Sequence, residues 1–319
     1  MITGLLASLL LPFAAPPLAR WAAPRLRPSV ALWALTFTAC ALAAGWLAAL
    51  GGLLLTGALG VSALARLGHL IHPLDVAPAA LADPAAALAV GALSLCAYGI
   101  TRSVLRQLRH YRRAREQVRG AAEAGDLSIL DRPDPDAYAL PGNPGRVVVT
   151  SGMLRALDGP EREALLAHER AHLSGRHHWF LAAADLAARC HPALRAVRDA
   201  IALAVERVAD EAAATATGDR RLTARAIGRA ALAGQAHGGG HGGAAVGARP
   251  AFAARAVGGP VPQRVRALLH PPTARPLAAA AAACLLVALA AGTTVTTGVG
   301  LDLLHHDVEV AQGEAPGGH

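Results

Sequence analysis

The sequence predicts a mainly α-helical, polytopic membrane protein of about four spans with a small α+β domain on one side of the membrane. Hydrophobic residues make up 54% of the 319 residues, charged residues make up 16%, and the mean hydropathy is +0.37, which together exclude a disordered chain. Four windows are free of ionisable side chains and long enough to cross a bilayer: 2–19, 30–59, 84–101 and 277–300. These windows divide the chain into a region of three spans (1–101), a block outside the hydrocarbon core (102–275), the fourth span (276–300) and a short tail (301–319).

The four windows differ in how clearly they indicate a span. The first resembles a cleavable signal peptide in length, but it lacks a basic start and contains Pro12, Pro16 and Pro17, so retention as a span is favoured. The second is long enough to tilt. The fourth is rich in alanine and ends in Thr-Thr-Val-Thr-Thr, so a buried helix is its alternative.

The arginines predict how the chain is oriented, because cationic residues beside spans stay in the cytoplasm. Arginines cluster after the first window, throughout 102–119 and before the fourth window, whereas the 60–83 loop carries only Arg66 and the tail after residue 300 carries none. We therefore expect the N-terminus outside, residues 102–275 in the cytoplasm and the C-terminus outside.

The run at 102–119 has helical spacing, with Arg102, Arg106, Arg109 and Arg113 on one face. Such a face suits nucleic acid or lipid headgroups. A helix leaving the bilayer favours the headgroups, so we expect the lipid bilayer as a partner and no direct nucleic-acid contact.

The cytoplasmic block contains one convincing strand signal, the β-branched run at 146–150, which follows a charged linker at 131–136. Asp158 is a plausible N-cap for a helix that ends by Gly175. A second helix is expected after His191-Pro192, an alanine-rich helix resumes near Thr223, and the Gly/Ala/His-rich stretch 234–260 is typical of a loop.

The motif that carries chemistry is His168-Glu169-Arg170-Ala171-His172. Residues four apart share a helix face, so the two imidazoles can bind one cation while Glu169 faces water bound to it. Catalytic Zn²⁺ usually takes a third protein ligand, and Glu206 is the candidate, with Asp210 on the same face placed to orient a ligand imidazole. The alternative is that Glu206 and Asp210 pair with Arg207, Arg198 or Arg220 on a solvated face; Glu211 is expected to be exposed.

The order of strand, His-Glu-x-x-His helix and Glu-x-x-x-Asp helix resembles the gluzincin membrane peptidases, which have a zincin-like catalytic domain. Two branches fit: the BlaR/MecR-type signalling metallopeptidases and the HtpX-type quality-control proteases. The four spans, the motif between spans three and four, Leu140-Pro-Gly, and Arg264-Val-Arg-Ala-Leu-Leu before the last span are more similar to the first branch. With only about twenty residues after the fourth window, the external penicillin-binding sensor of antibiotic-responsive members has no counterpart, so beta-lactam sensing is not expected.

The resemblance implies that His168, His172 and Glu206 bind zinc and that Glu169 is the general base of an endopeptidase. It also implies a regulatory role on a cytoplasmic protein, with a BlaI/MecI-type repressor as the first candidate. The alternatives are HtpX-type degradation of membrane proteins and a non-catalytic metal-binding scaffold. The 147–150 strand is a candidate to hold substrate by edge pairing. Further candidates near the reaction are His177, His178, Tyr138, Arg220 and Arg221, whereas His237 and His241 are expected in a linker.

Overall fold

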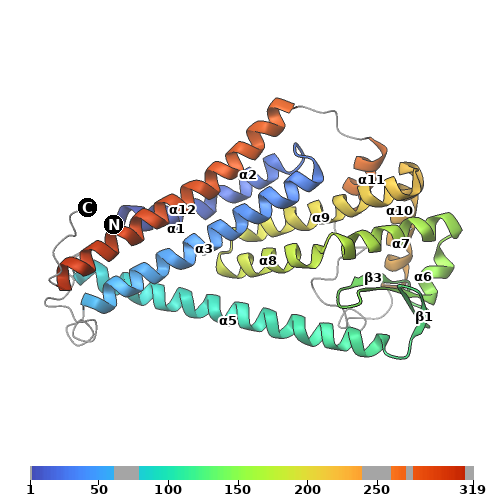
Figure 1. Ribbon diagram of the computed structural model, residues 1–319, viewed down its shortest axis with the longest axis horizontal. Coiled ribbons are helices and arrows are strands. Elements are labelled where there is room, and N and C mark those ends of the chain that lie inside the picture. Colours follow the sequence, from blue (N-terminus) through green and yellow to red (C-terminus); the bar gives the residue numbers. More distant parts are fainter. Residues whose placement is uncertain (1, 61–78, 239–259, 271–275, 313–319) are drawn as a thin grey trace.

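The computed structural model describes residues 2–60, 79–238, 260–270 and 276–312. Long helices lie roughly alongside one another, and a small sheet lies against the far end of one of them (Figure 1). The chain is a mainly α-helical polytopic membrane protein, as the sequence predicts.

Four stretches in the described residues are long and apolar enough to span a membrane. The first runs from Leu5 to Ala22 through α1 (Ile2–Leu10), the short 3-10 helix η1 (Leu11–Ala14) and α2 (Ala15–Ala22). The others lie in α3 (Pro28–Gly60), α5 (Ala79–Val118) and α12 (Pro276–Gln312). The arginine run continues α5 without a break, so its predicted helical spacing is confirmed.

Hydroxyl and small side chains join the first, second and fourth spans. The Ser8 hydroxyl hydrogen-bonds those of Thr297 at 2.8 Å and Thr296 at 3.0 Å, which ties α1 to α12. A Cβ added at Gly45 on α3 would lie 2.3 Å from the Thr293 methyl carbon, so the two helices approach as closely as glycine allows. Close approach and interhelical hydrogen bonds are the usual basis of helix association in lipid.

Two helices of the predicted cytoplasmic block pack directly on the spans. Helix α8 (His177–Cys190) and helix α9 (Leu194–Thr217) share one hydrophobic cluster with α2, α3 and α12. Between these two helices His191 is buried, and its ring lies edge-on to those of Phe13 and Trp46. The ring centroids are 4.9 Å and 4.5 Å from that of His191. Helix α8 is absent from the sequence prediction, which places only α9 and the later helix. The domain boundary predicted at residue 102 stays a prediction. One hydrophobic cluster nevertheless contains residues from both sides of this boundary.

The sheet has four strands rather than the one the sequence indicates. They are β1 (Ala122–Ala124), β2 (Leu127–Leu130), β3 (Ala137–Leu140) and β4 (Arg146–Thr150), in the order β1-β2-β4-β3. Strand β4 is parallel to β2 and antiparallel to β3, so it lies inside the sheet. The prediction that 147–150 is a substrate-binding edge is therefore wrong; among the described residues the edges are β1 and β3.

Helices cover both faces of this sheet. Tyr138 and Val148 pack against Ala114 and Val118 at the end of α5. Ala137 and Val149 alternate to the other face and pack with Met153 of α6 (Ser151–Ala156) and Leu165 of α7 (Gly159–Ser174). This second face therefore supports the helix that carries the His-Glu-x-x-His motif.

The predicted linker at 131–136 is held against the start of α6. The Thr150 hydroxyl accepts from the Met153 and Asp136 amides and donates to the Asp134 carbonyl at 2.7 Å. A Cβ at Gly152 would lie 2.0 Å from the Pro133 carbonyl oxygen, so only glycine allows this approach. These contacts fix Asp136, which leads into β3 beside the motif helix.

Candidate metal centre

Helix α7 presents the motif, and its first turn is capped as the sequence predicts. The Asp158 carboxylate accepts a hydrogen bond from the Glu161 amide at 3.0 Å, and the Glu161 carboxylate accepts one from the Asp158 amide at 3.2 Å. Glu161 is itself buried and pairs with Arg229 of α10 (Arg220–Gly238) at 2.6 Å. The helix ends at Ser174 with Gly175 as its C-cap, which confirms the prediction that it ends by Gly175.

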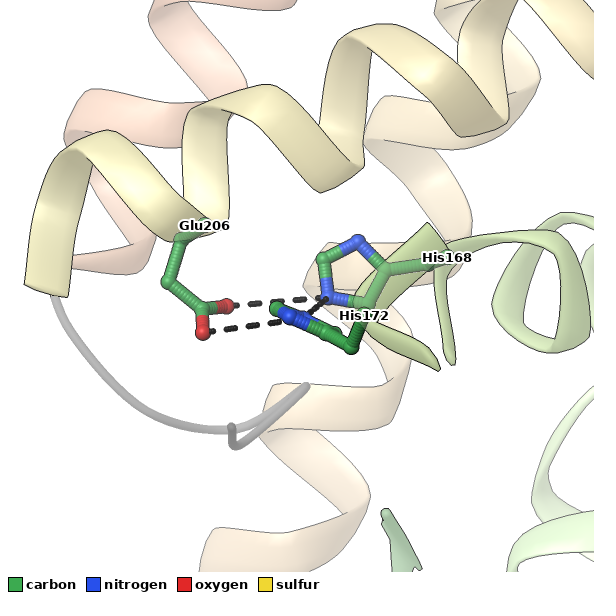
Figure 2. A group of neighbouring side chains, drawn as sticks. All are labelled: His168, His172 and Glu206. Atoms are coloured by element: carbon green, nitrogen blue, oxygen red, sulfur yellow. Dashed lines mark hydrogen bonds and ion pairs between the residues drawn. The ribbon is translucent and has the colours of Figure 1, made fainter. Parts of the chain in front are cut away.

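The structure brings together the three residues predicted to bind metal. His168 Nε2 lies 3.1 Å from His172 Nε2 and 3.6 Å from one Glu206 oxygen, and His172 Nε2 lies 3.8 Å from the other (Figure 2). One donor atom from each lies within 4.8 Å of the other two, and all three residues are buried. The two imidazoles come from α7 and the carboxylate from α9, as Figure 2 shows.

These separations suit a tetrahedral zinc site. Bonds of about 2.0–2.1 Å to nitrogen or oxygen, at tetrahedral angles, place neighbouring donor atoms about 3.3 Å apart. Two neutral imidazoles and one carboxylate are also a ligand set found in zinc peptidases. Glu169, adjacent to His168, is 0% exposed, and neither of its carboxylate oxygens has a hydrogen-bond partner among the described residues. A buried carboxylate without a donor fits a position that faces bound water.

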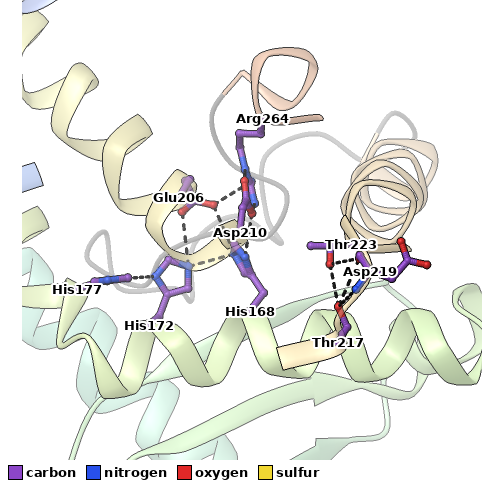
Figure 3. A network of polar contacts seen from close by, with 9 residues as sticks. All are labelled: His168, His172, His177, Glu206, Asp210, Thr217, Asp219, Thr223 and Arg264. Atoms are coloured by element: carbon purple, nitrogen blue, oxygen red, sulfur yellow. Dashed lines mark hydrogen bonds and ion pairs between the residues drawn. The ribbon is translucent and has the colours of Figure 1, made fainter. Parts of the chain in front are cut away.

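Asp210 lies where the sequence places it, behind His168. Its Oδ1 is 3.0 Å from His168 Nδ1, which leaves Nε2 directed at the cluster (Figure 3). This contact fixes the ring and its tautomer, as carboxylates that contact the outer nitrogen of a metal-binding histidine do at zinc sites. Burial opposes ionisation of Asp210, but hydrogen bonds from Arg264 and His168 hold its pKa below the usual value.

Arg264 is the residue of this site that the sequence analysis missed as a functional group. It lies on α11 (Val261–Leu269) and is 0% exposed. Its Nη1 lies 2.8 Å from a Glu206 carboxylate oxygen, and its Nη2 and Nε donate to the two Asp210 oxygens at 2.6 and 2.8 Å. The alternative of surface pairs with Arg207, Arg198 or Arg220 is therefore wrong. Burial disfavours a charged guanidinium, but Asp210 and Glu206 outweigh it and raise the pKa of Arg264.

His177 contacts the cluster through His172. Its Nδ1 lies 2.8 Å from His172 Nδ1, and burial, followed by the charge of His168, lowers its pKa to about 4. A neutral His177 can accept a hydrogen bond from His172 and so leave His172 Nε2 free for a metal. The turn that places it requires Gly175, where a Cβ would lie 2.4 Å from His177 Nε2, and Arg176 at φ +49°. His178 is only partly buried and lies against Trp179.

The remaining candidates lie elsewhere or cannot be placed. Arg220 is bound to Glu211 at 2.6 Å and to the Leu268 carbonyl, which leaves Glu211 half-buried rather than fully exposed. Arg221 is exposed, and Tyr138 faces α5, away from α7. The side chain of His237 and all of His241 lie outside the described residues.

Burial and the neighbouring charges shift the pKa values of the clustered side chains in different directions. Burial opposes a charged His168, but hydrogen bonds to Asp210 and Glu206 outweigh it and raise its pKa to about 9. Burial raises the pKa of Glu169 to about 8. Burial, followed by the charge of His168, lowers the pKa of His172 well below its ordinary value.

Zinc binding is therefore expected to release protons. The proton on His168 competes for Nε2 below its pKa of about 9, so apparent zinc affinity should rise with pH up to that value, by about tenfold per unit for one competing proton. Calorimetry of the metal-free chain at pH 7, in two buffers of different ionisation enthalpy, should give different binding enthalpies. Identical enthalpies would contradict the protonation state assigned to His168.

Fold and site together describe a polytopic membrane protein with a buried cluster of two histidines and one glutamate that could hold a metal ion. Residues 106–197 match the family described as Peptidase family M48. A stretch of 52 residues is 46% identical to a protein named "Protease HtpX homolog" from Pelotomaculum thermopropionicum, and it covers 16% of this chain and 18% of that relative. No solved structure matches the chain significantly.

Proposed function

We propose that the chain is a zinc-dependent integral membrane endopeptidase. The observation that carries the proposal is the buried His168, His172 and Glu206 cluster, with the Glu169 carboxylate beside it that has no hydrogen-bond partner among the described residues. In a metalloprotease the metal would have a hydrolytic role, and the ligand set of two imidazoles and one carboxylate favours zinc. The three residues would hold Zn²⁺, which when bound supplies a Lewis acid that polarises a carbonyl and acidifies water.

The side chains around the metal ligands would move the proton and hold the ligands in place. Glu169, fully buried beside the clustered donors, would accept the proton of the attacking water and deliver it to the leaving amine. Asp210 holds the His168 ring in one tautomer, and His177 does the same for His172. Arg264 fixes Glu206 and balances its charge.

Strand β3 is the better candidate to hold the substrate. It is an edge strand of the described sheet, and its first residue, Ala137, packs with Leu165 of the motif helix. Asp136, immediately before it, is close enough to raise the pKa of Glu169. An extended peptide added to this edge would lie beside the catalytic carboxylate.

The substrate proposed first is a cytoplasmic protein, namely a BlaI/MecI-type repressor. Arginine placement supports this side of the membrane, with the N-terminus outside, residues 102–275 in the cytoplasm and the C-terminus outside. The start of α1 and the end of α12 lie together at the end of the bundle opposite the sheet, which is compatible with this orientation (Figure 1). The BlaR/MecR-type resemblance of the motif spacing supports the regulatory role.

The second candidate function is HtpX-type quality control of membrane proteins. The 52-residue similarity to a protein named as an HtpX homologue favours this function. It shares the metal centre and the general base with the first candidate and differs in its substrates: many damaged membrane proteins rather than one soluble regulator.

Metal removal tests the activity, and mapping of cleavage products separates the two functions. Chelation should abolish cleavage of a peptide library by the purified chain, and one equivalent of zinc should restore it. New protein N-termini in cells with the wild-type chain and with Glu169→Gln should then identify either one cytoplasmic protein or many membrane proteins. Purified chain without stoichiometric zinc or zinc-dependent cleavage would leave only a non-catalytic scaffold.

A further inference from the structure

A cavity of about 680 Å³ lies where α2, α9 and α11 meet, and none of the metal-centre residues lines it. Its apolar side is formed along α9, chiefly by Ala196, Ala200, Leu203 and Ala204. Its volume is in the range of cavities that hold a small molecule or part of a lipid.

Three arginines from three different elements surround this cavity: Arg20 of α2, Arg207 of α9 and Arg266 of α11. Within the described residues, none of their guanidinium groups makes a hydrogen bond or an ion pair. The acidic residue in the lining, Asp199, already pairs with Arg198 at 2.7 Å.

The cavity also lies at an edge of the membrane-spanning region. Arg20 is in the last turn of α2, and the first candidate span ends at Ala22. His270, another lining residue, follows α11 shortly before the last span begins at Pro276. The ends of membrane spans are where lipid headgroups are found, and basic pockets between spans recognise anionic headgroups.

We propose that this cavity binds one anionic phospholipid, with its phosphate among Arg20, Arg207 and Arg266 and the upper part of an acyl chain along the alanines of α9. Charge favours an anion, and the apolar wall favours a lipid over a free phosphate. Arg207 follows Glu206 on α9, and Arg266 lies two positions after Arg264 on α11. Arg264 of α11 contacts Glu206 and Asp210 of α9 at the metal centre. The lipid would therefore join the same two helices at a second place, away from the metal centre.

Native mass spectrometry of the purified full chain tests this binding without metal or proteolysis. We expect one dioleoyl phosphatidylglycerol bound per chain, with dioleoyl phosphatidylcholine bound far more weakly. Arg207→Gln combined with Arg266→Gln should weaken binding by roughly 30-fold, because each guanidinium near an anionic lipid contributes about fivefold. Arg20→Gln changes an exposed side chain and should weaken lipid binding about fivefold. This single variant still tests the proposal if the double variant is unstable.

The matched control is Arg155→Gln with Arg162→Gln, which removes the same charge from exposed positions on α6 and α7. Equal loss in this control would replace the cavity by general surface attraction and overturn the proposal. So would unchanged binding in the cavity variants. Glycerol 3-phosphate competing as well as the lipid would assign the site to a soluble anion instead. Arg207→Lys combined with Arg266→Lys should retain most of the binding, because both positive charges are kept.

Discussion

Glu169→Gln is expected to lower the rate of peptide cleavage by about 10²–10⁴-fold while zinc content stays unchanged. The amide has nearly the same shape as the carboxylate, but it cannot accept the proton of the attacking water. Glu169 is not among the clustered donors, so His168, His172 and Glu206 should bind metal as before. Zinc content by elemental mass spectrometry and cleavage rate by peptide assay should therefore separate in this variant.

The folded state gives no reason for the variant to unfold. Neither oxygen of Glu169 has a hydrogen-bond partner in the described residues, so the substitution breaks no bond within the protein. The matched control is Glu163→Gln, which removes an exposed carboxylate from the same helix and should leave cleavage unchanged. Full activity in Glu169→Gln would assign the base to another residue. An unchanged cellular effect from an inactive variant would indicate a scaffold.

The parts of the site that could be read from the sequence are those set by helical periodicity. Spacing of four places His168 above His172 on one face, and the same spacing places Asp210 beside Glu206. Asp158 was identifiable as a cap because its pattern is local. The structure brings these residues together from α7 and α9, so two local signals were sufficient to predict the clustered donors.

Features that depend on tertiary arrangement could not be read in the same way. Strand β1 is Ala-Glu-Ala, which carries no strand propensity and pairs with β2 through a turn at Gly125 with φ +64°. The interior position of β4 follows from strand order, which no local pattern encodes. Helix α8 begins after Arg176 in a left-handed conformation, where the sequence offers no clear start signal.

Arg264 illustrates the same limit within the site. In sequence it is one of several arginines before the last span, and that position alone indicates membrane orientation. Only the packing of α11 against α9 shows that its guanidinium is buried between Glu206 and Asp210. A buried, fully paired cation so close to two predicted acidic residues is therefore a finding of the structure.

Arg264→Met is expected to destabilise the metal-free protein by about 3–5 kcal/mol, because removal of one partner leaves buried charges uncompensated. Glu206 and Asp210 would then lie together without the cation that both now contact at 2.6–2.8 Å. The unfolding free energy of the purified chain measures this loss. Arg221→Met, which removes an exposed arginine from α10, should change stability little.

Two further measurements distinguish a charge effect from lost packing. Adding Asp210→Asn to Arg264→Met removes one of the stranded charges, so the double variant should recover part of the lost stability. Saturating zinc should also stabilise Arg264→Met more than the wild-type protein, since the bound cation compensates Glu206 where the guanidinium no longer does. Equal stabilisation of both proteins by zinc, together with no recovery in the double variant, would show that Arg264 acts through packing alone and not through its charge on the metal-binding carboxylate.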